Sequence, residues 1–259
     1  MTVTAADHRI MADALRLARR GLYTTDPNPS VGCIIVAPDG RVVGEGWHER
    51  AGKLHAEPLA LEQAGEAARG ATAYVTLEPC SHHGRTPPCA DQLVTAGISR
   101  VVYAMEDPNP IVSGSGEQKL MDAGIEGASG VLAAEAEELN RGYAMRMRCG
   151  RPWVRSKLAV SIDGRTALAN GESQWITGAA ARADVHRWRA RSSAVLTGSG
   201  TVLADNPSMN ARPDDIADFV PPLRIVLDSQ LRTSPAAKLF SVEGPVLICH
   251  CSDDGARAA

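Results

Sequence analysis

The sequence predicts an α/β protein of two domains, and three observations support this. Short apolar, β-branched runs typical of buried strands occur between stretches with a helical pattern. The chain has 259 residues, a length that suits one large or two modest domains, and Gly150-Arg151-Pro152 interrupts it. Side chains able to bind a metal ion lie at a strand end and at helix starts, where α/β sheets place ligand sites. We therefore expect domains over 1–149 and 150–259.

The first half predicts alternating helices and strands. Apolar residues at helical spacing mark one face of an N-terminal amphipathic helix: Ile10, Met11, Ala14, Leu17 and Ala18. Strands are predicted over 31–36 and 71–77, and helices over 56–64, 90–96 and 133–148. Cys33 is expected to be a buried strand thiol. Gly97 is expected to end the helix over 90–96. The last helix has its acidic residues first and its arginines last, which suits the helix dipole.

The second half predicts strands over 153–160, 223–228 and 246–248. The Gly198–Thr201 turn could cradle a phosphate on its backbone amides, although two glycines usually mark only a turn. Cys249-His250-Cys251 looks like a metal-binding tripeptide. We favour the interpretation that it ends a strand, where successive side chains point to opposite faces of the sheet.

A histidine, a glutamate and two cysteines predict the chemistry of the first half. His55 and Glu57 form a His-x-Glu pair, and Cys80 follows a proline and precedes Cys89 by nine residues. One imidazole and two thiolates suit zinc, and three protein ligands leave a position open for water. His-x-Glu followed by Pro-Cys and a second cysteine is the signature of zinc-dependent nucleobase deaminases, with Glu57 as the proton carrier.

Two other interpretations of these residues remain open. The three ligands could belong to a closed structural zinc site completed by His82 or His83, or they could be unrelated buried residues. Neither interpretation accounts for a glutamate two residues after the histidine, so we favour the catalytic one.

The segment 76–89 closely resembles the bifunctional deaminase–reductases of riboflavin biosynthesis, because eight residues separate Cys80 from Cys89 where other deaminases have two. Segments 26–32, 46–48 and 107–110 match the same family. The resemblance implies a cytidine-deaminase-like three-layer α/β/α domain with a mixed sheet and one zinc per chain. It also implies a substrate, 2,5-diamino-6-(5-phosphoribosylamino)pyrimidin-4(3H)-one, that loses its 2-amino group.

The resemblance further implies roles for residues around the zinc. Asn28 and His48 fall on the pyrimidine side, while His82 and Arg85 line the part of the pocket that meets the ribose phosphate. A guanidinium suits phosphate because it donates paired, charged hydrogen bonds. Without the resemblance, His48 could be a surface residue at a strand end and Arg85 a solvated charge.

Segments 156–165, 171–177 and 196–207 resemble the reductase domain of the same family, which has a dihydrofolate-reductase-like α/β fold and uses NADPH. By position, cofactor contacts are expected from Trp175, Thr201 and Asp205. Substrate contacts are expected from Lys157, Ser173, Arg189 and Arg212.

The chain departs from the family after residue 251, where nothing matches the family's Glu-Gly-Gly cofactor loop. We therefore expect a partial reductase domain with weak or no activity. Members of the family assemble through this domain, so the resemblance implies a homo-oligomer. The shortened domain makes this expectation weaker.

Composition excludes several other functions. The formal net charge of −3, without a basic stripe, and 4% aromatic residues argue against a nucleic-acid partner. No apolar run reaches the roughly 20 residues that span a bilayer, and the N-terminus lacks the apolar core of a signal peptide. Cysteines without a disulfide pattern indicate the cytoplasm. The enzymatic rival is a deaminase of a free base or nucleoside, of the cytidine or guanine type, which would not need Arg85.

Overall fold

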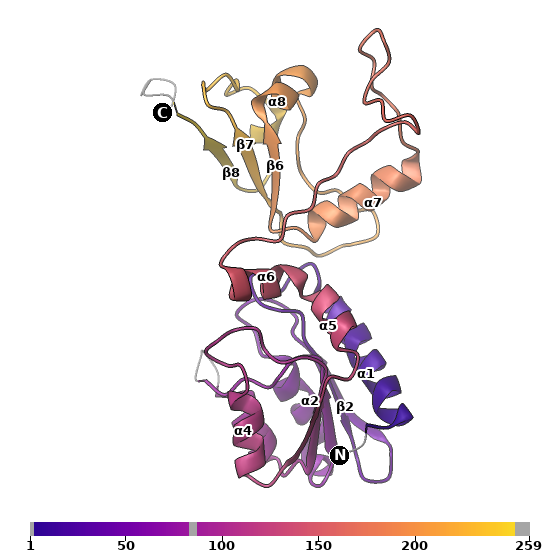
Figure 1. Cartoon of the computed structure of the whole chain (residues 1–259), viewed down its shortest axis with the longest axis vertical. Coiled ribbons are helices and arrows are strands. Elements are labelled where there is room, and N and C mark those ends of the chain that lie inside the picture. Colours follow the sequence, from indigo (N-terminus) through magenta and orange to yellow (C-terminus); the bar gives the residue numbers. More distant parts are fainter. Residues whose placement is uncertain (1–2, 83–86, 252–259) are drawn as a thin grey trace. The chain divides into compact units, whose positions relative to one another are not determined.

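The computed structural model describes residues 3–82 and 87–251, and the chain divides into two compact units, Met1–Val154 and Arg155–Ala259 (Figure 1). Each unit has its own sheet and its own hydrophobic core. In these two described ranges, no helix has the length and apolar character needed to cross a membrane.

The first unit is built on a five-stranded mixed sheet in the order β2-β1-β3-β4-β5. Its strands are β1 (Gly32–Val36), β2 (Val42–Trp47), β3 (Thr72–Val75), β4 (Arg100–Tyr103) and β5 (Glu126–Ser129). β1 runs antiparallel to both of its neighbours, whereas β3, β4 and β5 are parallel. The predicted mixed sheet is confirmed, and Cys33 is fully buried in β1.

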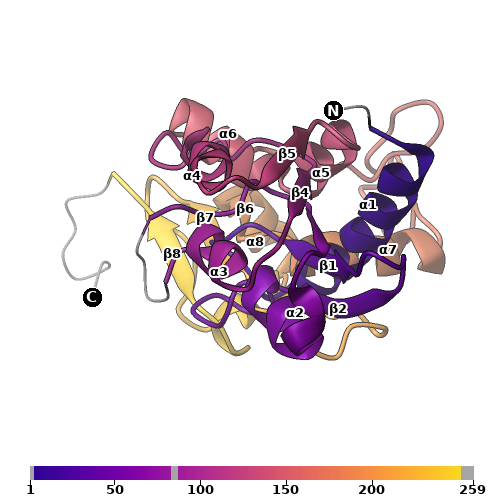
Figure 2. The same cartoon turned by 90° about the horizontal axis from the view of Figure 1, so that it is seen from below.

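Helices cover both faces of this sheet (Figures 1 and 2). They are α1 (Ala5–Ala18), η1 (Arg19–Gly21), α2 (Ala56–Ala64), η2 (Gly65–Ala68), α3 (Cys89–Thr95), α4 (Ser115–Asp122), α5 (Ala133–Leu139) and α6 (Arg141–Cys149). A Cβ on Gly32 would lie 2.2 Å from a backbone oxygen of α1, and one on Gly46 would lie 2.3 Å from a backbone oxygen of α2. Because Gly46 pairs with Cys33, the neighbour of Gly32, α1 and α2 lie on opposite faces.

The two outer layers follow from these contacts. On the α2 face, α3 contacts α2 and α4 contacts α3. On the other face, α5 lies beside α1 in both views (Figures 1 and 2). The first unit is therefore the predicted three-layer α/β/α domain.

The prediction of one continuous helix over 133–148 was wrong. The helix is interrupted at Asn140, which is buried and has φ −108° and ψ 22°. Its side chain accepts from the Ser30 amide at 2.8 Å and donates to the Ser30 carbonyl at 3.0 Å. The break lets one side chain satisfy both backbone groups of Ser30.

The second unit has a parallel three-stranded sheet in the order β6-β7-β8. Its elements are α7 (Ala179–Ala190), β6 (Ala194–Gly198), α8 (Ser199–Asp205), β7 (Leu223–Leu227), η3 (Lys238–Phe240) and β8 (Val246–Cys249). Its small core gathers Val202, Val226 and Leu239. This arrangement agrees with the α/β fold predicted for the reductase-like domain.

Two strand predictions in this unit need correction. Residues 153–160 form no strand, because none of the sheet strands in the described residues pairs with them, and Val154 and Leu158 are exposed. β8 forms as predicted but is only half buried, with Leu247 exposed.

Candidate active site

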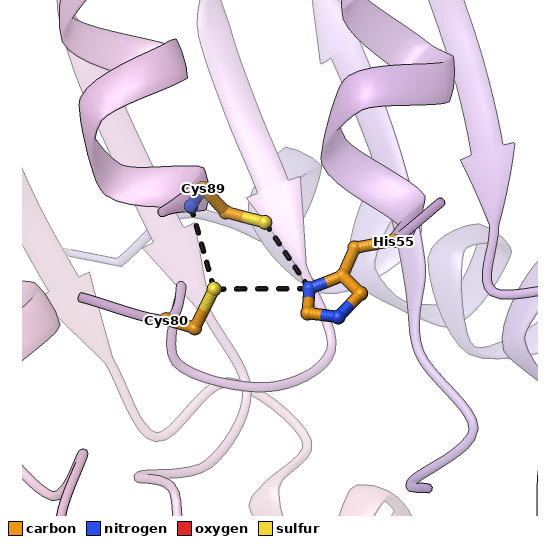
Figure 3. Close-up of side chains that lie close together, drawn as sticks. All are labelled: His55, Cys80 and Cys89. Carbon is orange, nitrogen blue, oxygen red and sulfur yellow. Dashed lines mark hydrogen bonds between the residues drawn. The ribbon is translucent and has the colours of Figure 1, made fainter. Parts of the chain in front are cut away.

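Three different elements bring the predicted metal ligands together (Figure 3). His55 is the N-cap of α2, Cys80 follows β3 in a loop, and Cys89 is the first residue of α3. In Figure 3 the side chains of Cys89 and His55, each at a helix start, point toward one another, and the side chain of Cys80 meets them from its loop. The prediction that Cys89 begins a helix is confirmed, and the dipole of a helix start favours a thiolate there.

The donor atoms of these residues have the spacing of a zinc site. His55 Nδ1 lies 3.3 Å from Cys89 Sγ and 3.7 Å from Cys80 Sγ, and all three donor atoms lie within 4.8 Å of one another. Tetrahedral ligation at ordinary zinc–ligand lengths puts nitrogen and sulfur roughly 3.5 Å apart. The residues therefore fit zinc in both chemistry and geometry.

Hydrogen bonds within the metal-free cluster favour a negative charge on the sulfur of Cys80. The Cys89 thiol, the His55 ring and the Cys89 backbone amide, which lies 3.4 Å from Cys80 Sγ, all lower the pKa of Cys80. The pKa of Cys89 is raised in turn, because it shares its proton with Cys80 and is buried. One thiolate is thus favoured before a metal ion binds, and deprotonation of both accompanies metal binding.

Glu57 lies in the first turn of α2 and is buried. Burial is the main cause that raises its pKa to about 6, with the negative charge of Cys80 adding to it. A carboxyl group whose pKa lies near the working pH can both take up and release a proton. The groups that act on this pKa besides burial include Cys80, His55 and Cys89, so the carboxyl group lies beside the metal cluster.

Asn28 and His48 form a hydrogen-bonded pair beside the cluster. His48 follows β2, is buried, and packs edge-on against the His55 ring, with the ring centres 5.6 Å apart. Its Nδ1 lies 2.8 Å from the Leu54 carbonyl oxygen, and its Nε2 lies 3.1 Å from Asn28 Nδ2. The possibility that His48 is a surface residue is wrong.

Of the other predicted residues of this site, His82 is not a member of the metal-binding group. His82 is exposed, while His83 and Arg85 lie outside the described residues. Among the residues with a described position, the metal-binding group has only three members, His55, Cys80 and Cys89.

The second unit has a cavity of about 850 Å³ that collects most of the residues predicted for the reductase. These are Lys157, Ser173, Trp175, Arg189, Asp205 and Arg212. Thr201 does not line the cavity and is exposed on α8. The Gly198–Thr201 turn caps and begins that helix.

Four titratable residues of this cavity were missed from the sequence: the basic Arg182, His186 and Lys238, and the acidic Asp214. The Arg182 guanidinium stacks over Trp175 at 4.4 Å from the ring centre, and His186 Nδ1 accepts from the Arg212 amide at 3.3 Å. Arg182, His186 and Arg189 are spaced i, i+4 and i+7 on α7, so helical periodicity around Arg189 could have found the first two.

Both halves of the chain match family models. Residues 4–105 match the cytidine and deoxycytidylate deaminase zinc-binding region, and residues 152–257 match the RibD C-terminal domain. The chain is 52% identical to the riboflavin biosynthesis protein RibD of Escherichia coli strain K12 over 258 residues, which cover 96% of this chain and 70% of the relative. It is 53% identical to RibD of Haemophilus influenzae over 253 residues, covering 94% and 68%.

Solved structures extend the similarity to the fold. Acinetobacter baumannii RibD superposes with a TM-score of 0.92 at 50% identity, over 98% of this chain and 71% of that one. A Thermotoga maritima diaminohydroxyphosphoribosylaminopyrimidine deaminase/5-amino-6-(5-phosphoribosylamino)uracil reductase superposes with a TM-score of 0.90 at 40% identity, over 96% and 71%. With a zinc-type deaminase cluster in one unit and a reductase-type domain in the other, the chain belongs to the RibD family of riboflavin-biosynthesis enzymes.

Proposed function

We propose that the first unit hydrolyses 2,5-diamino-6-(5-phosphoribosylamino)pyrimidin-4(3H)-one to 5-amino-6-(5-phosphoribosylamino)uracil and ammonia. The observation that carries the proposal is the cluster of His55, Cys80 and Cys89 with the buried carboxyl group of Glu57 beside it. The T. maritima relative, whose structure superposes on this chain, carries the name of this deaminase.

When bound, zinc supplies the nucleophile by lowering the pKa of a water ligand to roughly 7. Glu57 would take one proton from the attacking water and deliver it to the adjacent ring nitrogen, and would then take the remaining hydroxyl proton of the hydrated carbon and deliver it to the departing amine, which leaves as ammonia. Asn28 and His48 orient the pyrimidine ring, while Arg85 and His82 meet the ribose phosphate. Burial of Glu57 shields these proton transfers from bulk water.

Product analysis on matched substrates tests this assignment. The phosphorylated diaminopyrimidine is expected to release ammonia at a higher kcat/KM than its dephosphorylated counterpart. A deaminase of free bases or nucleosides would instead turn over cytidine or guanine and would not distinguish the two diaminopyrimidines.

We further propose that the second unit binds NADPH through Trp175, Asp205 and Thr201, and binds the deaminated product through Lys157, Ser173, Arg189 and Arg212. Reduction converts the ring-opened ribose to a ribityl chain. Weak NADPH turnover is expected, because one face of the three-stranded sheet is incompletely packed: Leu196 and Leu247 flank Ile225 on it and are 59% and 47% exposed. NADPH consumption near that of E. coli RibD would contradict this expectation.

The proposed enzyme works on a small molecule in the cytoplasm, without a nucleic-acid or membrane partner. The formal net charge of −3 supports this, since nucleic-acid binding depends on excess positive charge. Association of chains through the second unit is part of the same proposal and is testable by light scattering.

A further inference from the structure

Glu78 is a buried carboxylate that the proposed reaction does not use. It lies two residues before Cys80, in the segment that leaves β3, and is 2% exposed. It is not a member of the metal-binding cluster, and none of the ion pairs found among the described residues includes it. A buried carboxylate without a cation must be stabilised by hydrogen-bond donors.

Four backbone amides supply that stabilisation. Oε1 accepts from the amides of Gly116 and Glu117, at 2.9 and 3.3 Å. Oε2 accepts from the amides of Asp107 and Gly114, at 3.2 and 3.0 Å. Each carboxylate oxygen therefore receives two N–H groups, which suits a group that only accepts hydrogen bonds.

These amides belong to two parts of one segment. Gly116 and Glu117 are in the first turn of α4, whose N-cap, Gly114, offers no side-chain cap of its own. Glu78 thus caps α4 from another part of the chain, where the helix dipole favours a negative charge. Because the same carboxylate also binds the Asp107 amide, it joins both ends of the loop 107–114.

The residues on either side of Cys80 contact the start of α4 directly. A Cβ on Gly116 would lie 2.0 Å from the Pro79 carbonyl oxygen, so only glycine permits this approach. On the other side of Cys80, Ser81 Oγ lies 2.6 Å from Ser115 Oγ. Cys80 is thus enclosed by residues that are fixed to α4.

We propose that Glu78 is a positioning residue of the deaminase centre, holding the Cys80 segment and the loop 107–114 in one arrangement through the start of α4. The proposal rests on Cys80 being a metal ligand but does not depend on which pyrimidine is deaminated. It predicts that weakening the Glu78 bonds changes how the site holds a metal ion, beyond any loss of stability.

Glu78→Gln is the direct test, because glutamine keeps the shape of the side chain but turns an NH₂ group toward two N–H donors. The matched control is Asp7→Asn. Asp7 is also buried and hydrogen-bonded, but it bonds to Tyr74, Arg100 and Thr4, none of which belongs to the metal cluster. Both variants are compared with the unsubstituted chain by melting temperature, by zinc release to a colorimetric chelator, and by the absorption spectrum after Co²⁺ substitution.

Both variants are expected to melt at a lower temperature, but only Glu78→Gln should alter the metal site. For that variant we expect zinc release about tenfold faster, in the range found for residues that support metal ligands, and a changed thiolate-to-Co²⁺ absorption band. For Asp7→Asn, the rate of zinc release should stay within about twofold of that of the unsubstituted chain, a smaller change than residues that support metal ligands cause.

Zinc release and a Co²⁺ spectrum unchanged in Glu78→Gln would overturn the proposal and leave Glu78 with a purely structural role. An equal change in Asp7→Asn would overturn it as well. If Glu78→Gln yields no folded protein, Ser115→Ala decides, because it leaves Glu78 in place and removes the bond from Ser115 Oγ to Ser81 together with the bond that Ser115 Oγ donates to the Val112 carbonyl oxygen in the loop 107–114. Faster zinc release from Ser115→Ala supports the proposal, and unchanged release contradicts it.

Discussion

The orientation of Asn28 in the site is determined by the tautomer of His48. A carbonyl oxygen only accepts hydrogen bonds, so His48 Nδ1 must donate to Leu54. Burial lowers the pKa of His48 and favours the neutral ring, whose Nε2 then accepts from the Asn28 amide nitrogen. The amide oxygen of Asn28 consequently remains available for an N–H group of the substrate.

This geometry predicts the effect of removing the imidazole. His48→Ala should raise KM about tenfold, the effect of losing roughly one oriented hydrogen bond. Zinc content should stay the same, because His48 is not a member of the metal cluster. Steady-state kinetics with metal analysis checks both points, and an unchanged KM would show that Asn28 does not need His48.

Among the secondary-structure elements, α2 matters most for the site because it carries His55 and Glu57 at its start. It lies directly on β2, where a Cβ on Gly46 would come within 2.3 Å of the Ala56 carbonyl oxygen and 2.8 Å of the Ala60 amide nitrogen. The backbone of β2 therefore sets the height of both functional residues above the sheet.

Gly46→Ala should accordingly destabilise the first unit by about 1–3 kcal/mol, as overpacking does, and weaken zinc binding. The matched control is Gly142→Ala, since a Cβ on Gly142 in α6 meets nothing within 4 Å. This control should gain up to about 1 kcal/mol of stability from the better helix propensity of alanine. Denaturant unfolding and zinc titration of both variants distinguish the outcomes, and equal zinc affinity in both would contradict the role given to Gly46.

A buried ionic cluster fastens α1 to the sheet. Asp7 accepts from Tyr74 at 2.8 Å, from the Arg100 guanidinium at 2.8 and 3.2 Å, and from Thr4, with which it forms a capping box. The Arg100 bonds hold the pKa of Asp7 well below its ordinary value of 3.8. The ionised form is therefore favoured in the folded state.

A pKa lowered by folding means that Asp7 stabilises the protein above its unfolded pKa of about 4, and that this stabilisation is lost as the pH falls below it. Asp7→Asn should lose about 3–5 kcal/mol at pH 7, because it leaves Arg100 without its partner. Its free energy of unfolding should also decrease less between pH 5 and pH 3. Urea unfolding across this range tests the sign, and parallel pH profiles would contradict it.

For the molecule as a whole, the sequence predicted local features well and long-range ones poorly. The metal ligands and Glu57 could be placed because each lies within a short motif at a helix start or strand end. The break at Asn140 could not be predicted, since its cause is Ser30, 110 residues away. The role of Glu78 was missed for the same reason, because its four amide partners lie 29 to 39 residues further along the chain.

The separate cores of the two units predict how the whole chain responds to metal removal. Zinc stabilises only the unit that binds it, by about 2.7 kcal/mol when free zinc is 100 times the dissociation constant. A strong chelator should therefore lower the melting temperature of the first unit alone. Calorimetry on the chain with and without chelator checks this, and a shift of both transitions by the same amount would contradict it.

The central claim is that the cluster of His55, Cys80 and Cys89 is catalytic and that Glu57 carries its protons. Glu57→Gln keeps the shape of the side chain but removes its ability to accept a proton. Ammonia release from the phosphorylated diaminopyrimidine, measured together with zinc content, tests the claim most directly. For Glu57→Gln we predict about one zinc per chain and a rate of ammonia release that is about 10²–10⁴-fold lower than that of the unsubstituted chain. Full ammonia release by Glu57→Gln with zinc retained would contradict the account.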